Sequence, residues 1–298
     1  MAAPDRPEQD DQGQTAELAI GDLRPDSGRA LASGDQLREH LPGLEPERRV
    51  SDWGRSERLE GLVDRTLYEF LYHYWFRVDV EGIENVPRDG RALLVANRAG
   101  ALPADSVMVA RAIREEHPHA RQLHIATTHD LGGVPGLGAL VTKLGGVRAH
   151  PANLHRLLFD EDQLVLAFPE GTAGARKSVS ERYRLRDFAD GGFVEAAILA
   201  RAPIVPVAVV GGEEATPILA RVGLLGPFTS RARLPIVSAL PLPAKFKVRF
   251  LEPVAADSYD SDTLHHGALV QALSRDLRAL IQENLLEMVA QRRSAWLA

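Results

Sequence analysis

Two apolar segments of the chain each end in polar side chains that could do chemistry. The first, Ala92–Asp105, reads ALLVANRAGALPAD, in which a strand-like run ends at Asn97 and Gly100 and Pro103 lead toward a helix near Asp105. The second, Leu164–Thr172, reads LVLAFPEGT, and Glu170 follows its apolar run where packing hardly explains a carboxylate. Open α/β sheets bind ligands at the carboxyl ends of their strands. Both segments therefore predict a ligand site at one sheet edge.

Basic side chains surround the second segment in the sequence. They are Arg148, Arg156, Arg176, Lys177, Arg182, Arg184 and Arg186. Such groups bind phosphates through charge-assisted hydrogen bonds, which predicts a phosphorylated acceptor or the phosphates of coenzyme A. The alternative is a solvated basic surface, and it applies most to the run Arg182–Arg186.

Four motifs, spread from Tyr68 to about Pro253, resemble the lysophospholipid and glycerol-phosphate acyltransferase family. They are Asn97-Arg98 with Asp105, Leu144-Gly-Gly-Val-Arg148, Phe168-Pro-Glu-Gly-Thr172 and Ile204-Val-Pro-Val-Ala208. The resemblance implies that a histidine, oriented by an aspartate, deprotonates an acceptor hydroxyl, which attacks an acyl thioester carried by coenzyme A or acyl carrier protein. It also implies that Arg148, Glu170 and Thr172 bind the glycerol and phosphate groups of the acceptor. The other predicted substrate-binding residues are Asn97 and Gly171, from the same motifs, and Arg176 and Lys177, from the basic residues around the third motif.

The residue at the position of the family's catalytic histidine is Arg98, which is followed by Asp105 after six residues instead of four. A general base must be partly unprotonated near neutral pH, whereas a guanidinium stays charged. The catalytic positions that the resemblance implies are thus Asp105 and Arg98, and an Arg98 to Asp105 salt bridge is the alternative to any catalytic role of Arg98.

Another histidine could replace the missing base, and His129, just after the strand-like run Gln122–Thr127, is our candidate. For His124, His150 and His155 we expect no function. We predict no metal site and no bound cofactor, because His124 and His129 lack the helical spacing of zinc ligands and Gly132–Gly138 is an incomplete dinucleotide motif.

Short β-branched or apolar runs alternate with helical stretches along the body of the chain. The predicted strands are Arg77–Glu81, Ala92–Ala96, Gln122–Thr127, Leu164–Phe168, Ile204–Val210 and Phe246–Leu251, and a helix is predicted over Thr263–Val289. This alternation predicts an α/β fold with a mostly parallel central sheet flanked by helices.

An amphipathic aromatic helix is predicted before the first strand, over Arg55–Arg77. Helical spacing places one stripe toward the sheet, formed by Leu67, Phe70, Leu71, Tyr74, Trp75 and Val78. Aromatic residues outside the stripe, such as Tyr72 and Phe76, indicate an alternative in which the region Tyr68–Phe76 contacts a membrane.

Residues 1–55 contain no aromatic residue before Trp53 and predict a disordered acidic tail, with an acyltransferase-like domain over residues 56–298. Of the net charge of −6, residues 1–50 hold −5, from eleven acidic residues and six arginines. A nearly neutral body does not favour nucleic acid as a partner. The absence of cysteine and of a long apolar segment predicts a cytoplasmic protein, with peripheral attachment at the inner face of the membrane left open.

The leading hypothesis is therefore an acyltransferase of phospholipid metabolism, with a lipid acceptor and an acyl-CoA or acyl carrier protein donor as its partners. The alternative is a lipid-binding or acyl-carrier-binding protein that keeps the pocket without the reaction. A third hypothesis is a scaffold that uses the aromatic helix for dimer contacts; the sequence leaves the oligomeric state open.

Overall fold

The structure is a computed structural model that describes residues 51–98, 103–127, 137–188, 191–216, 218–223, 233–237, 241–256, 267–292 and 294. The predicted acidic tail lies outside the described residues except for Ser51–Arg55. Two of these five residues, Trp53 and Arg55, contact the folded body. Trp53 Nε1 donates a hydrogen bond of 2.7 Å to Glu161, and Arg55 is buried.

The core of the fold is a seven-stranded sheet with the order β1-β9-β6-β2-β5-β3-β4. Its strands are β1 (Asp79–Glu81), β2 (Ala92–Ala96), β3 (Leu123–Thr127), β4 (Gly146–Arg148), β5 (Leu164–Ala167), β6 (Ile204–Val210) and β9 (Lys247–Phe250). The strands from β6 to β4 are parallel, whereas β9 is antiparallel to β6 and parallel to β1. The mostly parallel α/β sheet is therefore confirmed. The short strand β4 and an antiparallel pair, β7 (Ile218–Gly223) with β8 (Arg233–Val237), were not predicted.

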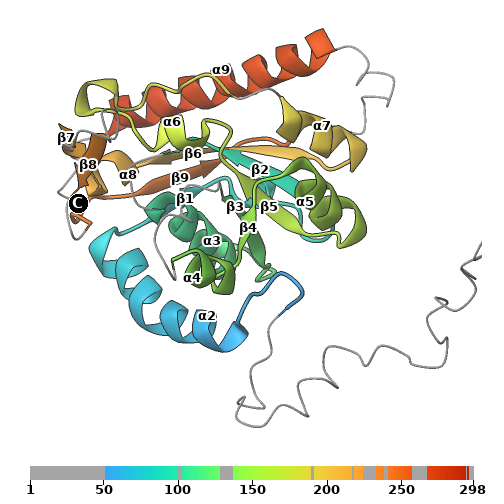
Figure 1. Ribbon diagram of the computed structural model, residues 1–298, viewed down its shortest axis with the longest axis horizontal. Coiled ribbons are helices and arrows are strands. Elements are labelled where there is room, and N and C mark those ends of the chain that lie inside the picture. The colour runs from blue at the N-terminus through green and yellow to red at the C-terminus, as the bar shows by residue number, and fades with distance from the viewer. Residues whose placement is uncertain are drawn as a thin grey trace, which may run out of the picture. The chain divides into compact units, whose positions relative to one another are not determined.

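Helices cover both faces of this sheet (Figure 1). They are α2 (Glu57–Val63), α3 (Ala104–Glu116), α4 (Leu137–Lys143), α5 (Pro151–His155), α6 (Gly171–Gly174), α7 (Gly192–Leu199), α8 (Gly212–Ala215) and α9 (Gly267–Gln291). In the described part of the chain, no helix combines the length and apolar character that a bilayer crossing requires.

Side chains of the central strands alternate between two apolar layers, which explains why these strands are apolar throughout. Leu93 and Val95 of β2 pack in the layer that includes residues of α5, α7 and α9. Leu94 of the same strand packs in the opposite layer, with Met108 of α3 and Phe76. The sheet is thus held from both sides, and its carboxyl edge is fixed in place.

The aromatic segment before β1 is helical, but the predicted buried stripe is wrong in part. Tyr72 and Phe76 are almost fully buried at 1% and 0% exposed, whereas Leu67, Phe70 and Tyr74 are 52%, 48% and 72% exposed. Two π-helical turns, Asp64–Tyr68 and Leu71–Trp75, cause the difference. A π turn spaces its hydrogen bonds five residues apart, as in the 2.7 Å bond from Phe76 N–H to Leu71 C=O, so the buried side shifts from the 3.6-residue phase.

Substitutions in this segment test the shifted phase. Phe76→Ala should lower the free energy of unfolding by about 3 to 5 kcal/mol, because it leaves a cavity in the core. Phe70→Ala should change it by less than about 0.5 kcal/mol, because the ring is half exposed. Urea unfolding measures both changes. A larger loss of unfolding free energy for Phe70→Ala than for Phe76→Ala would contradict the shifted phase.

Candidate active site

Asn97, directly after β2, ties this strand to its neighbour β6. Its side-chain amide donates to Val209 C=O at 2.9 Å and accepts from Val209 N–H at 2.7 Å. The side chain is 1% exposed and does not line the cavity described below. In this structure Asn97 therefore fixes the sheet edge instead of facing a ligand.

Glu170, after β5, joins three loop segments through one buried carboxylate. It accepts hydrogen bonds from Arg98 N–H at 2.9 Å and from Arg186 N–H at 2.7 Å. Lys177 Nζ lies 2.8 Å from the same carboxylate. All of these partners come from the protein itself, and Glu170 is not among the residues that line the cavity. The structure places Glu170 behind the wall of the site, where it positions the backbone of Arg98.

Lys177 connects Glu170 to a second buried carboxylate, that of Glu213. The ammonium group lies 3.5 Å from Glu213 and donates to Arg98 C=O at 3.2 Å. Burial raises the pKa of Glu213 to about 7, although Lys177 and a hydrogen bond from Tyr183 N–H favour its charged form. The contacts of Lys177, like those of Glu170, thus hold the loop that carries Arg98.

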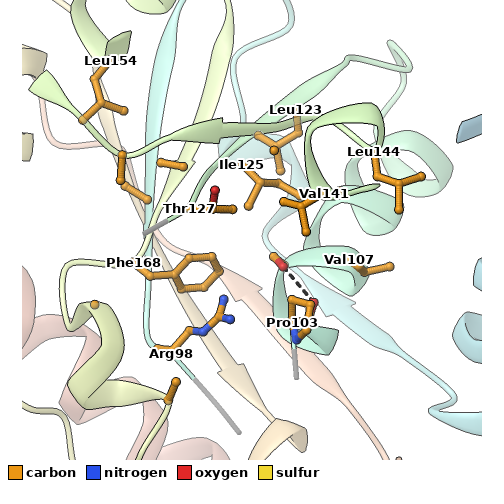
Figure 2. A pocket seen from close by; sticks show the side chains of 18 of the residues that line it. Arg98, Pro103, Val107, Leu123, Ile125, Thr127, Val141, Leu144, Leu154 and Phe168 are labelled. Carbon is orange, nitrogen blue, oxygen red and sulfur yellow. Dashed lines mark hydrogen bonds between the residues drawn. The ribbon is translucent and has the colours of Figure 1, made fainter. Parts of the chain in front are cut away.

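Arg98 faces the cavity and covers Asp105. A guanidinium nitrogen of Arg98 lies 3.4 Å from Asp105, a weak contact, and its central carbon lies 4.9 Å from the centre of the Phe168 ring. Asp105 is fully buried in the first turn of α3 and accepts from Ser106 N–H at 2.8 Å. The predicted Arg98 to Asp105 salt bridge is present, and Figure 2 shows the guanidinium beside the Phe168 ring.

A cavity of about 780 Å³ extends from Arg98 along α3 and the carboxyl edge of the sheet. One wall is apolar and comes from α3, β3 and the α4 region. It includes Val107, Ala110, Leu123, Ile125, Val141 and Leu144, several of which Figure 2 shows around the pocket. Volume and lining are typical of a site for a small molecule with a large apolar part.

The cavity also reaches the other face of the sheet, toward α5 and α7. Ala126, Ala167, Leu154 and Phe193 line this part, and all four belong to the opposite apolar layer. The carboxyl edge of β3 and β5 therefore lies between the two parts, with Arg98 and Phe168 among the residues that line the same cavity.

The structure brings together some of the predicted site residues and separates others. Gly171, Thr172 and Arg176 line the cavity with Arg98, whereas Arg148 is exposed at the end of β4 and does not line it. His129 lies outside the described residues, so its predicted role stays a prediction.

Sequence reasoning gave no role to His150, which does line the cavity. Its Nδ1 accepts from Ala152 N–H at 3.2 Å at the start of α5, so its neutral ring carries the proton on Nε2 and acts as a donor. His124 does not line the cavity, and burial lowers its pKa to about 4. Neither imidazole therefore replaces the missing base in the described geometry.

Fold and site together define an α/β protein with a largely apolar ligand cavity at the carboxyl edge of a parallel sheet. Residues 77–210 match the family described as Acyltransferase. Uncharacterized proteins of Mycobacterium tuberculosis and Mycobacterium bovis are 37% identical to the chain over 267 residues, covering 87% of it and 74% of their own length. The chain belongs to the acyltransferase family.

Two further comparisons concern lipid enzymes. A Gallus gallus protein described as a DGAT1/2-independent enzyme synthesizing storage lipids is 29% identical over 186 residues, covering 61% of this chain and 54% of its own. The crystal structure of the 1-acyl-sn-glycerophosphate acyltransferase PlsC from Thermotoga maritima superposes with a TM-score of 0.53 at 18% identity, covering 80% of this chain and 84% of that one. This likeness shows the shared fold.

The raised pKa of Glu213 predicts a pH-dependent stability. Between its usual pKa of 4.5 and about 7, the folded protein holds the Glu213 proton and the unfolded chain releases it. The contribution of this group to stability therefore falls as the pH rises through this window. Compared with Glu213→Gln, the wild type should lose about 1 to 3 kcal/mol of unfolding free energy from pH 5 to pH 8.

Denaturant unfolding at several pH values measures this difference. The exposed Glu252→Gln is the matched control, and its pH dependence should follow that of the wild type. If the unfolding free energies of the wild type and Glu213→Gln changed equally with pH, the assigned effect of burial on Glu213 would be contradicted.

Proposed function

We propose that the chain transfers a fatty acyl group from a thioester, carried by coenzyme A or acyl carrier protein, to a hydroxyl of a lysophospholipid or glycerol phosphate. The observation that carries the proposal is the largely apolar cavity that begins at Arg98 and Phe168. Family membership supports the reaction class, and the description of the Gallus gallus relative supports a lipid product.

The reaction places the thioester carbonyl beside Arg98. The acceptor oxygen attacks the carbonyl carbon, a C–O bond forms, and the C–S bond breaks. The hydroxyl proton leaves through solvent, and the thiolate takes up a proton in turn. Arg98, held by Glu170 through its backbone, stabilises the negative charge on the carbonyl oxygen. Because no described residue serves as the base, we expect a rate about 10² to 10⁴ lower than base catalysis would give.

Polar groups of the cavity lining support a phosphorylated acceptor. Thr172 and Arg176 line the cavity with Arg98, and His150 contributes a ring that donates through Nε2. Arginine and hydroxyl groups bind phosphate oxygens through charge-assisted hydrogen bonds. These groups take the role of binding the acceptor phosphate, which the sequence had suggested for Arg148 and Glu170.

The exposed side of the aromatic segment supports peripheral contact with a membrane. Leu62, Leu67, Phe70 and Tyr74 are between 48% and 72% exposed. Tyr68 and Asp64 of the same segment line the cavity, so the segment adjoins both solvent and ligand site. A lipid could pass between bilayer and cavity along this segment.

Vesicle binding tests this contact. Leu67→Ser with Phe70→Ser should lower the fraction of protein that sediments with phosphatidylglycerol vesicles severalfold, because apolar burial at the interface drives binding. The matched control is Leu286→Ser, which removes an exposed leucine, 55% exposed, from α9. Equal sedimentation of the wild type, the double variant and the control would contradict the proposal.

The Arg98 to Asp105 contact favours a second candidate, a binding protein for acyl chains with an anionic head group. A guanidinium that covers the buried aspartate turns a proton-accepting site into one that binds anions. The cavity and Arg98 would then retain the lipid without chemical turnover.

Thiol release from acyl-coenzyme A distinguishes the candidates. It is measured with lysophospholipids and glycerol phosphate for the wild type, Arg98→His and Arg98→Ala. Acyl transfer predicts slow wild-type release that needs an acceptor and is lost in Arg98→Ala. It predicts release about 10² to 10⁴ faster in Arg98→His, where an imidazole can reach Asp105. Release by Arg98→His alone would establish the binding protein. No release by the wild type or by Arg98→His would contradict acyl transfer.

A further inference from the structure

The cavity has two apolar parts on opposite faces of the sheet, with the carboxyl edge of β3 and β5 between them. The part beside α3, which we call the α3 part, is lined by Val107, Ala110 and Ile125. The part beside α5 and α7, which we call the α5 part, is lined by Leu154 and Phe193. A single acyl chain that starts at the sheet edge extends along one face of the sheet, so the donor chain fills only one part. The other part can hold a second chain.

Two alanines make room for the α5 part in the sheet. The strand pairings place Ala167 beside Val95 and Ala126 beside Val147, and β3 lies next to β5. The row across β2, β5, β3 and β4 is therefore valine, alanine, alanine and valine, and all four side chains belong to one apolar layer. Both alanines line the cavity, whereas the two valines do not. Because alanine is smaller than valine, the alanine pair forms a recessed floor under the α5 part.

The side chains that form the floor and walls of the α5 part are apolar and keep some accessible surface. Ala126, Ala167, Leu154 and Phe193 are 6% to 8% exposed, although they belong to the core layer. Apolar surface of this kind gains free energy when an apolar ligand removes it from water. A polar group placed there would lose its hydration without gaining a partner. The α5 part therefore suits a hydrocarbon chain.

Groups that suit a phosphate lie directly beside the α5 part. His150 lines the cavity at the start of α5, and Leu154 follows one turn later, a rise of about 6 Å along the helix axis. Arg98, Thr172 and Arg176 line the same cavity, and the two arginines complement a phosphate in charge. A molecule that joins a phosphate group to a hydrocarbon chain thus finds partners for both of its ends in this cavity.

We propose that the α5 part binds the acyl chain of the acceptor, so that the acceptor is a monoacyl glycerol phosphate and not glycerol phosphate itself. This inference rests on the proposed acyl transfer. The donor chain occupies the α3 part, and the free hydroxyl of the acceptor meets the thioester carbonyl at Arg98. A C–O bond forms, the C–S bond breaks, and the released thiolate takes up a proton. The product carries two chains, one on each face of the sheet.

Native mass spectrometry of the full chain counts the bound chains without any turnover. The protein is mixed with stearate and with stearoyl lysophosphatidate, a monoacyl glycerol phosphate. We expect a complex that contains one molecule of each. Glycerol phosphate should not add to the stearate complex at the same concentration, because it has no chain for the α5 part.

Two results of this count would contradict the inference to different extents. A protein that never holds more than one chain would overturn the second chain site and leave acyl transfer to glycerol phosphate intact. Binding of neither lipid would overturn the proposed acyl-chain cavity as well.

A series of lysophosphatidates with octanoyl, lauroyl and stearoyl chains tests the α5 part in the wild type. With stearate bound, their affinity should rise about fourfold for each methylene group that enters the α5 part. Equal affinity for all three lipids would overturn the site. This series needs no variant, so it decides the question even if a substitution in the sheet prevents folding.

Ala167→Leu should fill the α5 part. It should weaken the binding of lysophosphatidate to the stearate-loaded protein about tenfold, because the larger side chain displaces about two methylene groups of the ligand. The matched control is Ala110→Leu on α3, which should weaken the binding of stearate instead. Loss of lysophosphatidate binding in Ala110→Leu and not in Ala167→Leu would place the acceptor chain in the α3 part and overturn the inference.

Discussion

The buried carboxylate of Glu170 is the constraint on which the site depends. It accepts hydrogen bonds from the backbone N–H groups of Arg98 and Arg186 and pairs with the ammonium group of Lys177. One side chain thus joins the loop after β2, the turn after β5 and the segment before α7. A buried charge is stable only when its partners are complete, so displacing any of these loops would leave a carboxylate unpaired. This requirement fixes the position of Arg98 at the cavity.

The apolar wall and the polar ends of the cavity follow from its place at the sheet edge. Side chains of β3 alternate between the two faces, so Leu123 and Ile125 line one part of the cavity and Ala126 the other. Burying a methylene group in such a wall stabilises a complex by about 0.8 kcal/mol. An acyl chain would therefore supply most of the binding free energy, and the polar groups at either end would determine its orientation.

The sequence predicted the strands that carry the site better than the contacts of their polar residues. The runs Ala92–Ala96 and Ile204–Val210 are strands with the predicted bounds, because strands buried on both faces are apolar throughout. The position of Glu170 at a strand end was also predicted from its apolar run. Its role was not, because two of its partners are backbone N–H groups, which leave no signature in side-chain spacing.

Two other features escaped prediction for different physical reasons. The phase of the aromatic segment changes at π-helical turns, and a pattern search at 3.6 residues places Tyr72 and Phe76 on the wrong side. The cavity lining also brings Asp64 together with Arg111, which pairs with it although it lies about fifty residues further along the chain. Only tertiary packing brings such groups together.

Photocrosslinking can show whether the cavity holds an acyl chain with its reactive end at Arg98. The full chain is irradiated with a fatty acid that carries a diazirine at mid-chain, and the labelled residues are mapped by mass spectrometry. We expect labels on Val107, Ala110, Ile125 or Val141, which line the cavity wall, and we expect excess stearate to remove these labels. Labels confined to the exposed residues Leu67, Phe70 and Tyr74 would contradict this placement of the acyl chain.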